Sequence, residues 1–414
     1  MLSSQPFGAI LNRIQNGSNE TVLIQQERQS SNHYRNAYRW TLPRQFEMEE
    51  FAKPSNLREV FNGLKRGGGR APGVDGLSYH DFSNSEIHAA IQNLSRCLLD
   101  GSYSPRPVRV IRIPKGDGRY RELALQTILD RVVAKGMDLA VKPIWQLHLP
   151  NLARDVFRLF AQLEQSIRRH RRYTLAISDV ENCFPTTPLQ PVVDLHRRIL
   201  GADAALLDLI KKIIRCQDGT EVGLLQGSPY SPTVMESFLQ YQLDSTMEGQ
   251  TPFTPLLFRY VDNLMYLCSD EEQGRQILER ASDTLDPFKM RLKPTALDII
   301  DIRANHNVST LGFIVNWTNG RLNFSIPEDA YESLERKVIQ AMSMCDHQKV
   351  VKHLVLSWIR SKGPALTKAT ALSVSDKLID TCNTVGFRSI QRHEIRDTAK
   401  IAYRQWSRLI SNQV

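Results

Sequence analysis

The chain has 414 residues with 41% apolar side chains, enough for two or three packed units. Its net charge of +9 and isoelectric point near 9.2 favour a polyanionic partner. No run approaches about 18 consecutive apolar residues, and the N-terminus lacks a basic-then-apolar leader, so neither a membrane span nor a secretory signal is expected. Six scattered cysteines without Cys-x-x-Cys spacing exclude a zinc site or a disulfide framework and indicate reduced thiols in a cytoplasmic protein.

Residues 1–59 are predominantly polar and predict an N-terminal arm. The arm contains a basic and aromatic stretch at His33–Trp40. Leu57–Leu64 predicts a helix that ends at the glycine run Gly67–Gly69, because consecutive glycines stop helices.

From Ala71 to about Phe324, short strand-like runs alternate with helical ones, which predicts an α+β body within residues 60–330. Strands are expected at Val108–Ile113, Thr174–Ser178, Leu256–Val261, Leu264–Cys268, Ala296–Ile302, Leu311–Val315 and Leu322–Ser325. Helices are expected at Leu129–Val141, Pro191–Leu200, Ala204–Cys216 and Pro232–Met247.

Residues 331–414 form the third predicted part, an all-helical region with a basic balance. Apolar residues keep a helical spacing after Pro327, and 14 Lys and Arg face 7 Asp and Glu from Tyr331 onward. A second basic run, Arg168–Arg172, lies just before a predicted strand. Each run alone is compatible with a solvated helix face, but two such runs together favour binding to nucleic acid.

Two carboxylates stand at the ends of predicted strands. Asp262-Asn263 separates two apolar runs within Leu256–Cys268, a polar step that suits a tight hairpin turn. An ordinary Asp-Asn turn explains that segment as well as a metal ligand does. The apolar run Thr174–Ser178 is followed by Asp179. Because two-metal phosphoryl transfer needs carboxylates from separate strands, the pair predicts a Mg²⁺ site.

Gly223–Pro232 is a loop that opens a helix. Its glycines allow close backbone approach to a ligand, while Ser231 and Pro232 suit the cap and the first turn of the helix. Capping alone accounts for part of this pattern.

Taken together, six segments resemble bacterial and group II intron-type reverse transcriptases, and they follow the order of that family. Gln226–Pro232 resembles the Q-G-x-x-x-S-P loop, Phe258–Asn263 the R-Y-x-D-D catalytic hairpin, and Asp179–Phe184 the first catalytic strand. The other three are Arg70–Ser78, similar to the A-P-G-x-D-G entry to the fingers; Ile113–Leu123 with Asp130–Val133, similar to the fingers hairpin and its helix; and Leu311–Phe313, similar to the primer grip. The resemblance implies a right-hand polymerase fold, with fingers, an antiparallel palm sheet flanked by helices, and a helical thumb-like region.

The resemblance also implies a role for each matching position. Asp179, Asp262 and the backbone carbonyl of Val180 would ligate Mg²⁺. The implied nucleotide-binding residues are Lys115 and Arg121 on the triphosphate, Phe184 as the gate against a ribose 2′-OH, Gln226 and Gly227 beside the sugar and base, and Lys293 near the pyrophosphate. Lys289 competes with Lys293 for that last role. Leu311, Gly312 and Phe313 would hold the primer.

Asn263 departs from the family, which usually has a second aspartate there. An asparagine oxygen can still approach a metal, but it brings no charge. We therefore retain Asn263 as a catalytic candidate and carry two hypotheses: an RNA-directed DNA polymerase, or a weakly active or inactive RNA-binding scaffold. Glu181 is a further candidate to compensate, with a solvent-facing glutamate as the simpler interpretation.

Within the family, the chain most resembles stand-alone bacterial reverse transcriptases of antiphage defence and abortive infection. No Cys/His cluster suggests a zinc-bearing endonuclease, and no V-T-G segment of the retron type follows residue 330. The resemblance implies dNTPs as substrates, an RNA template (a dedicated non-coding RNA), a DNA product and no membrane partner.

Overall fold

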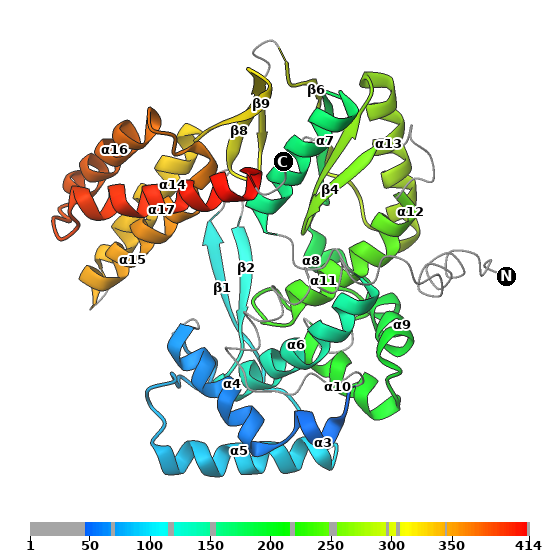
Figure 1. The fold of residues 1–414 in the computed structure, drawn as a ribbon. Helices are drawn as coiled ribbons and strands as arrows, with labels where there is room; N and C mark the ends of the chain where they lie inside the picture. The colour runs from blue at the N-terminus through cyan, green and yellow to red at the C-terminus, as the bar shows by residue number, and fades with distance from the viewer. Residues whose placement is uncertain are drawn as a thin grey trace. The chain divides into compact units, whose positions relative to one another are not determined.

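The computed structural model describes residues 46–67, 71–114, 120–149, 155–215, 220–247, 255–294, 298–303, 307–343 and 346–411. The chain divides into two compact units (Figure 1). Unit 1 contains the described residues of Met1–Ala153, Asn182–Thr246 and Thr284–Met290, and unit 2 those of Arg154–Glu181, Met247–Asp283 and Arg291–Val414. Among the helices described, none is long and apolar enough to cross a membrane. The domain boundaries expected from the sequence, at 59/60 and 330/331, stay a prediction.

Unit 1 is mainly helical and is built around one buried helix, α6 (Ile128–His148). Thr127 caps α6 by accepting a hydrogen bond from the backbone N–H of Asp130. The other helices of this unit are α3 (Met48–Phe51), α4 (Pro54–Gly67), α5 (Asn84–Leu99), α8 (Cys183–Thr186), α9 (Leu189–Leu200), α10 (Ala204–Ile214) and α11 (Ser231–Leu239). A π-helical turn, Gln240–Asp244, and α12 (Ser245–Met247) follow α11.

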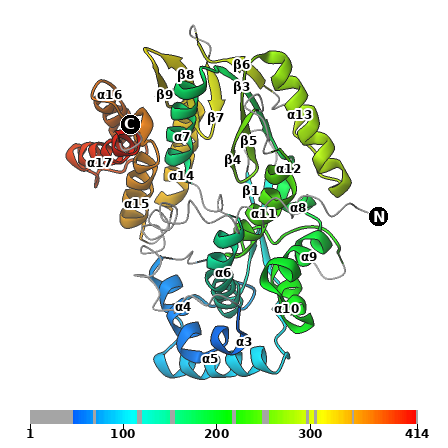
Figure 2. The same ribbon diagram turned by 45° about the vertical axis from the view of Figure 1, so that its right-hand side comes forward.

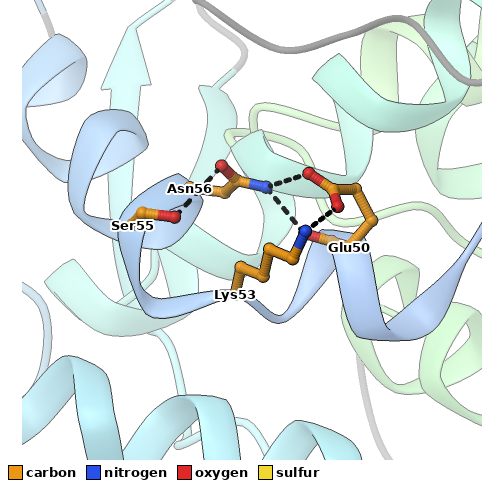
Figure 3. A network of polar contacts seen from close by, with 4 residues as sticks. All are labelled: Glu50, Lys53, Ser55 and Asn56. Carbon is orange, nitrogen blue, oxygen red and sulfur yellow. Dashed lines mark hydrogen bonds and ion pairs between the residues drawn. The ribbon is translucent and has the colours of Figure 1, made fainter.

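A polar network holds the junction between α3 and α4 (Figure 3). Asn56 donates to the backbone carbonyl of Glu50 at 2.7 Å and to its carboxylate at 3.1 Å. Lys53 pairs with the same carboxylate. These hydrogen bonds, that of Lys53 first, lower the pKa of Glu50, so the carboxylate stays charged and the short turn between the helices is fixed.

One antiparallel hairpin of unit 1 joins β1 (Arg109–Pro114) to β2 (Tyr120–Leu125), with Ile113 opposite Arg121. Its outer part is solvent-exposed, whereas Ala124 near its base is buried. Figure 1 shows the hairpin as a long two-stranded projection.

The centre of unit 2 is a four-stranded antiparallel sheet in the order β4-β5-β3-β6. Its strands are β3 (Thr174–Asp179), β4 (Leu256–Tyr260), β5 (Asn263–Cys268) and β6 (Asp298–Asp301). One face packs against α7 (Val156–His170), whose Leu159 and Leu163 share a core with Leu175. Gly274 of α13 (Glu271–Leu285) lies on the other face beside Ala176, where an added Cβ would come 3.3 Å from that side chain. Figure 2 shows α7 and α13 on either side of this sheet.

A second sheet of unit 2 contains β7 (Val308–Thr310), β8 (Phe313–Thr318) and β9 (Arg321–Ser325), all antiparallel. It packs on α7 through aromatic rings: Phe160 lies 5.7 Å from Phe313 and 5.0 Å from Phe324, between ring centroids. Helix α7 therefore contributes to one apolar core shared by both sheets.

The C-terminal part of unit 2 is all-helical, with α14 (Glu328–Met342), α15 (His347–Arg360), α16 (Thr370–Thr384) and α17 (Arg392–Ser411) around a core of their own. Trp406 of α17 also reaches the core around α7, at 5.2 Å from Phe324 and 6.3 Å from Phe157. The predicted α+β class, with antiparallel strands flanked by helices and a helical C-terminal region, is confirmed.

Several predicted elements differ from the structure. The expected strand Leu311–Val315 begins with a turn at residues 311 and 312, and β8 starts at Phe313. The expected helix Pro232–Met247 is interrupted by the π-helical turn. Four cysteines fall within the described residues, and all four are free thiols, as predicted: Cys97, Cys183, Cys268 and Cys382.

Candidate active site

Asp179 ends β3, one of the two buried central strands of the four-stranded sheet. The five residues before it, Thr174–Ser178, are buried because both faces of the sheet are covered, whereas Asp179 itself is half-buried. In the register of the sheet, Asp179 stands opposite Asn263 of β5. The strand thus delivers one carboxylate to the end of an otherwise apolar layer.

The turn between β4 and β5 consists of Val261 and Asp262, so the prediction of an Asp262-Asn263 turn is wrong by one residue. Asn263 is instead the first residue of β5 and pairs with Tyr260. Val261 has a φ of +56°, which a β-branched residue adopts only at a cost of about 1–3 kcal/mol. Strain of this kind is concentrated at functional sites.

Arg259 supports this turn from within the sheet. Its side chain is only 3% exposed, and its guanidinium donates to the carbonyl of Val261 at 2.8 Å. A buried cation is costly unless it is hydrogen-bonded, so the contact stabilises both partners. Arg259 lies within the Phe258–Asn263 motif, which by itself predicts no role for this side chain.

Backbone hydrogen bonds bring the two carboxylate positions together. The N–H of Val180 donates to the carbonyl of Asp262 at 3.0 Å. The N–H of Lys293 donates to the carbonyl of Asp179 at 2.7 Å. The amide of Asn263 donates to the Asp262 carboxylate at 3.2 Å. Five predicted site residues therefore lie together in unit 2, at one end of the sheet.

The donor set at this end suits a magnesium ion. It offers the carboxylates of Asp179 and Asp262 together with nearby backbone carbonyls, all oxygen ligands. No group of three or more His, Cys, Asp or Glu residues occurs among the residues that the structure describes. Mg²⁺ is commonly held by one or two protein carboxylates and completes its shell with water and phosphate, so this set fits it better than it fits zinc.

Lys293, one of the two candidate lysines, adjoins Asp179 through its backbone N–H. The candidate Glu181 is tied to the chain just before Lys293, because its N–H donates to the carbonyl of Arg291 at 2.8 Å. Lys289 belongs to unit 1, where it is exposed and has a φ of +57° after a 3₁₀ turn, Asp286–Phe288. The placement within unit 2 favours Lys293.

Two of the three candidate primer-grip residues form the β7–β8 turn, and the third, Phe313, is the first residue of β8. Leu311 and Gly312 make a tight turn with φ of +50° and +77°, and Phe313 is buried in the core. Lys362, which is 8% exposed, donates to the carbonyl of Gly312 at 2.9 Å and lies 5.0 Å from the centre of the Phe313 ring. Burial lowers the pKa of Lys362. Sequence reasoning missed Lys362, since a lysine between helices carries no pattern.

In unit 1 the structure joins three of the candidate nucleotide-binding segments. The N–H of Ala124 on β2 donates to the carbonyl of Gln226 at 2.8 Å. Gly227 has a φ of +117°, and a Cβ there would come 2.5 Å from the carbonyl oxygen of Ala124, so only glycine fits. The N–H of Leu224 donates to the carbonyl of Phe184 at 2.8 Å. Phe184, in α8, is half-buried.

Of the two candidate phosphate-binding cations, Arg121 falls within the described residues of the β1–β2 hairpin. Arg121 is exposed on β2 and stands opposite Ile113. Lys115 lies outside the described residues. Arg121, Gln226, Gly227 and Phe184 thus belong to one connected surface of unit 1, and the carboxylates to unit 2.

A buried histidine supports the helix that follows the Gln226–Gly227 loop. His196 of α9 contacts the carbonyl of Val192 and the hydroxyl of Tyr230, both at 2.7 Å. Since a carbonyl only accepts, Nδ1 carries the proton and Tyr230 donates to Nε2. Burial lowers the pKa of His196 to about 4, so the ring stays neutral and fixes the start of α11.

Comparisons with known proteins find a matching family model and partial relatives. Residues 113–315 match the family model described as reverse transcriptase (RNA-dependent DNA polymerase). The Escherichia coli (strain K12) protein YkfC is 27% identical over 209 residues, which cover 45% of this chain and 54% of YkfC. A Saccharomyces cerevisiae protein named for intron 2 of COX1/OXI3 is 25% identical over 174 residues, covering 39% of this chain and 20% of that protein. The chain thus spans about half the length of one curated relative and a fifth of the other.

Among solved structures, telomerase from Candida albicans with a telomeric RNA fragment matches with a TM-score of 0.39 and 10% identity, over 75% of this chain and 64% of that one. Apo telomerase from Candida tropicalis matches with a TM-score of 0.41 and 11% identity, over 73% and 67%.

Proposed function

We propose that the chain, which carries a reverse transcriptase domain over residues 113–315, is an RNA-directed DNA polymerase that adds deoxynucleotides to a DNA strand on an RNA template. One observation carries the proposal: Asp179 and Asp262 stand at the same end of the β3–β5 pair, joined by the Val180–Asp262 hydrogen bond. Both residues lie within 113–315, the range that matches the reverse transcriptase family model, which supports the proposal.

The carboxylates of Asp179 and Asp262, with the carbonyl of Val180, would hold Mg²⁺. When bound, magnesium lowers the charge on the triphosphate and activates the attacking 3′-hydroxyl. Arg259 keeps Asp262 at the tip of its turn by holding the carbonyl of Val261. Lys293, whose backbone N–H donates to the Asp179 carbonyl, would give a proton to the leaving pyrophosphate.

The nucleotide-binding roles fall to unit 1. Lys115 and Arg121 would clamp the triphosphate of a dNTP, because cations on a hairpin bind phosphoryl oxygens strongly. Gly227 lets the Gln226 loop pack closely against β2, and Gln226 and Gly227 would lie beside the sugar and base. Phe184 would reject a ribose 2′-OH by contact. Leu311, Gly312 and Phe313 would hold the primer end.

The alternative is an RNA-binding scaffold that has lost catalysis. Asn263 favours this alternative, since the usual second carboxylate is replaced by an amide. Against it stands the retention of Arg121, Asp179, Gln226 and Asp262 together, which RNA binding alone does not require. Asn263 can also serve the enzyme, because its amide donates to Asp262 and so orients the carboxylate.

A finer proposal concerns the biological setting. We assign the chain to the intron-like bacterial lineage and, within it, to stand-alone enzymes of antiphage defence that copy a dedicated non-coding RNA in the cytoplasm. The support is the likeness to an E. coli protein and to an intron-named yeast protein, together with the motifs already described. Sequencing the nucleic acid that co-purifies with the protein tests it: a single RNA species with matching DNA is expected, and a random RNA population would contradict it.

The catalytic proposal is tested by Asp179→Ala and Asp262→Ala. Each should lower Mg²⁺-dependent incorporation of labelled dNTPs on a primed RNA template by at least about 10³-fold, because each removes charge stabilisation at the reacting phosphate. RNA affinity should change by less than about twofold, since basic surfaces supply it. Asp283→Ala, at an exposed position of α13, is the matched control and should retain full activity. Wild-type incorporation by either site variant would contradict the assignment.

A further inference from the structure

The end of β3 opposite Asp179 brings three segments together. Two backbone hydrogen bonds tie them: Ile302 donates to the carbonyl of Tyr173 at 3.0 Å, and Trp317 donates to the carbonyl of Ile302 at 2.7 Å. Tyr173 immediately precedes β3, residue 302 follows β6, and Trp317 lies in β8. The chain therefore places two aromatic side chains side by side, with ring centroids 5.8 Å apart.

Arginines flank both rings. The guanidinium of Arg303 lies 4.6 Å from the centre of the Tyr173 ring, and that of Arg168 lies 6.0 Å from the centre of the Trp317 ring. The rings are half-buried, so part of each remains open to solvent. We call this surface the arginine–aromatic patch, and it consists of Arg168, Arg169, Arg171, Tyr173, Arg303 and Trp317.

Two carboxylates hold arginines of the patch in place. Glu164, which is 3% exposed, accepts from Arg168 at 2.6 Å and from the backbone N–H of Leu322 at 3.3 Å. Asp301 accepts from Arg303 at 2.9 and 3.0 Å. Asp270, another acid at this end of the sheet, caps α13 by accepting from the N–H of Gln273. These contacts orient the guanidinium groups.

The arginines nevertheless dominate the local field. Arg169 and Arg171 are exposed at the C-terminal end of α7, where Arg171 closes the helix in the left-handed conformation with a φ of +55°. Burial and then the charges of Arg172 and Arg169 lower the pKa of His170 beside them. Positive charges that disfavour a proton on histidine attract a phosphate, so the arginine contribution to this shift agrees with a phosphate-binding surface.

We propose that the arginine–aromatic patch is a second nucleic-acid site that binds single-stranded RNA, separate from the site of polymerisation. Bases stack on open aromatic rings and on guanidinium planes, while arginines neutralise phosphates. A strand rises about 3.3 Å per residue, so Thr174 and Asp179 lie roughly 17 Å apart. That separation keeps the patch away from the carboxylates. The choice of RNA over DNA rests on the proposed function.

The patch favours single strands over duplexes because its rings are useful only to unstacked bases. An acidic protein segment could pair with the arginines, but it would leave the two aromatic rings without a role. A flexible RNA strand uses both kinds of side chain. In the proposed polymerase, such a site would retain part of the template that is not being copied.

Charge removal is the first test, on the full chain with labelled oligouridine in a binding titration. R169Q/R303Q neutralises two exposed arginines and spares Arg168, whose buried partner Glu164 would be left without its cation. We expect affinity to fall about tenfold and the slope of log K against log salt to shrink by about 1.4, at about 0.7 per phosphate contact. R275Q/R280Q on α13 makes the same charge change outside the patch and should alter affinity by less than about twofold.

Ring removal is the second test. Trp317→Leu should weaken oligouridine binding about tenfold, the size of one lost base stack, whereas Trp317→Phe should keep most of the affinity. Stacking also quenches tryptophan fluorescence, so the quenching of wild-type protein by oligouridine should be reduced in Trp317→Phe although that variant still binds. Trp317→Phe preserves an aromatic ring against the core and therefore remains informative where Trp317→Leu is destabilised.

Equal effects of R169Q/R303Q and R275Q/R280Q, or full quenching in Trp317→Phe, would overturn the proposal and leave a protein partner for this surface. Duplex RNA binding as tightly as oligouridine would overturn it too. These measurements need no DNA synthesis. If the patch binds RNA in a protein that incorporates no dNTP, the polymerase proposal fails and the patch stands; if the protein polymerises but the patch variants bind normally, only the patch fails.

Discussion

The two ends of β3 carry opposite chemistry. At the Asp179 end, half-buried carboxylates meet at a strained turn, and nearby groups are fixed by backbone hydrogen bonds. At the Tyr173 end, exposed arginines surround two aromatic rings. Few and rigid acidic groups suit metal chemistry, whereas several exposed basic groups suit affinity for a polyanion. The strand β3 thus separates a region suited to nucleotide addition from a region suited to RNA binding.

The difference also explains what each end tolerates. At the acidic end, Val261 is held in a disfavoured conformation by its neighbours, so small changes in Arg259 or Asp262 should disturb geometry. At the basic end, the arginines act mainly through charge and can substitute for one another. Variants at the acidic end should therefore alter the rate of synthesis or the nucleotide selectivity without changing RNA affinity. Variants at the basic end should alter RNA affinity without changing nucleotide selectivity.

The largest effect is expected on sugar selectivity, from a change at Phe184. Phe184→Val should raise rNTP use relative to dNTP use by about 10–100-fold, because a contact that rejects one extra hydroxyl is worth a few kcal/mol at most. RNA affinity should not change, since Phe184 is not a cation. The ratio of kcat/KM for the two nucleotides on one template measures the effect.

Phe184→Tyr is the matched control because it keeps the ring and should keep the preference for dNTPs. An unchanged ratio of rNTP to dNTP use in Phe184→Val would contradict the role of Phe184 as the gate. A simultaneous loss of RNA affinity would contradict the separation of nucleotide selectivity from RNA binding.

A smaller effect is expected from pH at the basic end. Burial and the charges of Arg172 and Arg169 hold the pKa of His170 below its ordinary value of 6.5 in the free protein. A bound phosphate would raise that pKa, so RNA binding takes up a proton and affinity increases as the pH falls through the RNA-bound pKa. The gain should stay below about tenfold, which corresponds to one pKa unit.

Binding titrations from pH 8 downward, at constant salt, measure this effect. His170→Gln should abolish the increase, and His88→Gln, at an exposed position of α5, should retain it. Affinity that is independent of pH in the wild-type protein would show that RNA does not approach His170.

The smallest effect is expected for Asn263→Asp at the acidic end. The added charge can help to hold Mg²⁺, but it replaces the hydrogen bond to Asp262 by repulsion between carboxylates. A partly exposed charge is worth less than about 1 kcal/mol, so activity at saturating Mg²⁺ should stay within about fivefold. The Mg²⁺ concentration at half-activity should fall.

Thermal unfolding provides a second measurement on the same variant. Without metal, Asn263→Asp should lower the Tm by a few degrees, and Mg²⁺ should restore it. A variant and a wild-type protein that are both silent with every template and metal would favour the scaffold alternative.

Much of the acidic end could be predicted from sequence because motifs with fixed spacing mark it. Asp179 and Asp262 follow apolar runs, and the loop at Gln226 has its own pattern. The turn itself was predicted one residue too late, since propensity places Asp-Asn in a turn and avoids a valine with positive φ. Tertiary support from Arg259 overrides that preference.

Other contacts could not be predicted because they join segments distant in sequence. Lys362 reaches the carbonyl of Gly312, and Trp317 reaches residue 302, without any local signature in the sequence. The basic run at Arg168–Arg172 is visible in the sequence, but the two aromatic rings beside it come from separate segments, Tyr173 before β3 and Trp317 in β8. A run of charged residues is easily seen in a sequence, whereas contacts between residues from distant segments are not.

The position of Trp406 also has a consequence for the order in which the molecule forms. Phe157 and Phe324 pack against Trp406, which belongs to the last helix described, whereas α7 is made much earlier in synthesis. Contacts between segments far apart in sequence form slowly, and chains are synthesised from the N-terminus. Until α17 has left the ribosome, these rings lack one of their packing partners. Nascent chains should therefore expose these apolar rings, and depend on chaperones, until α17 packs against them.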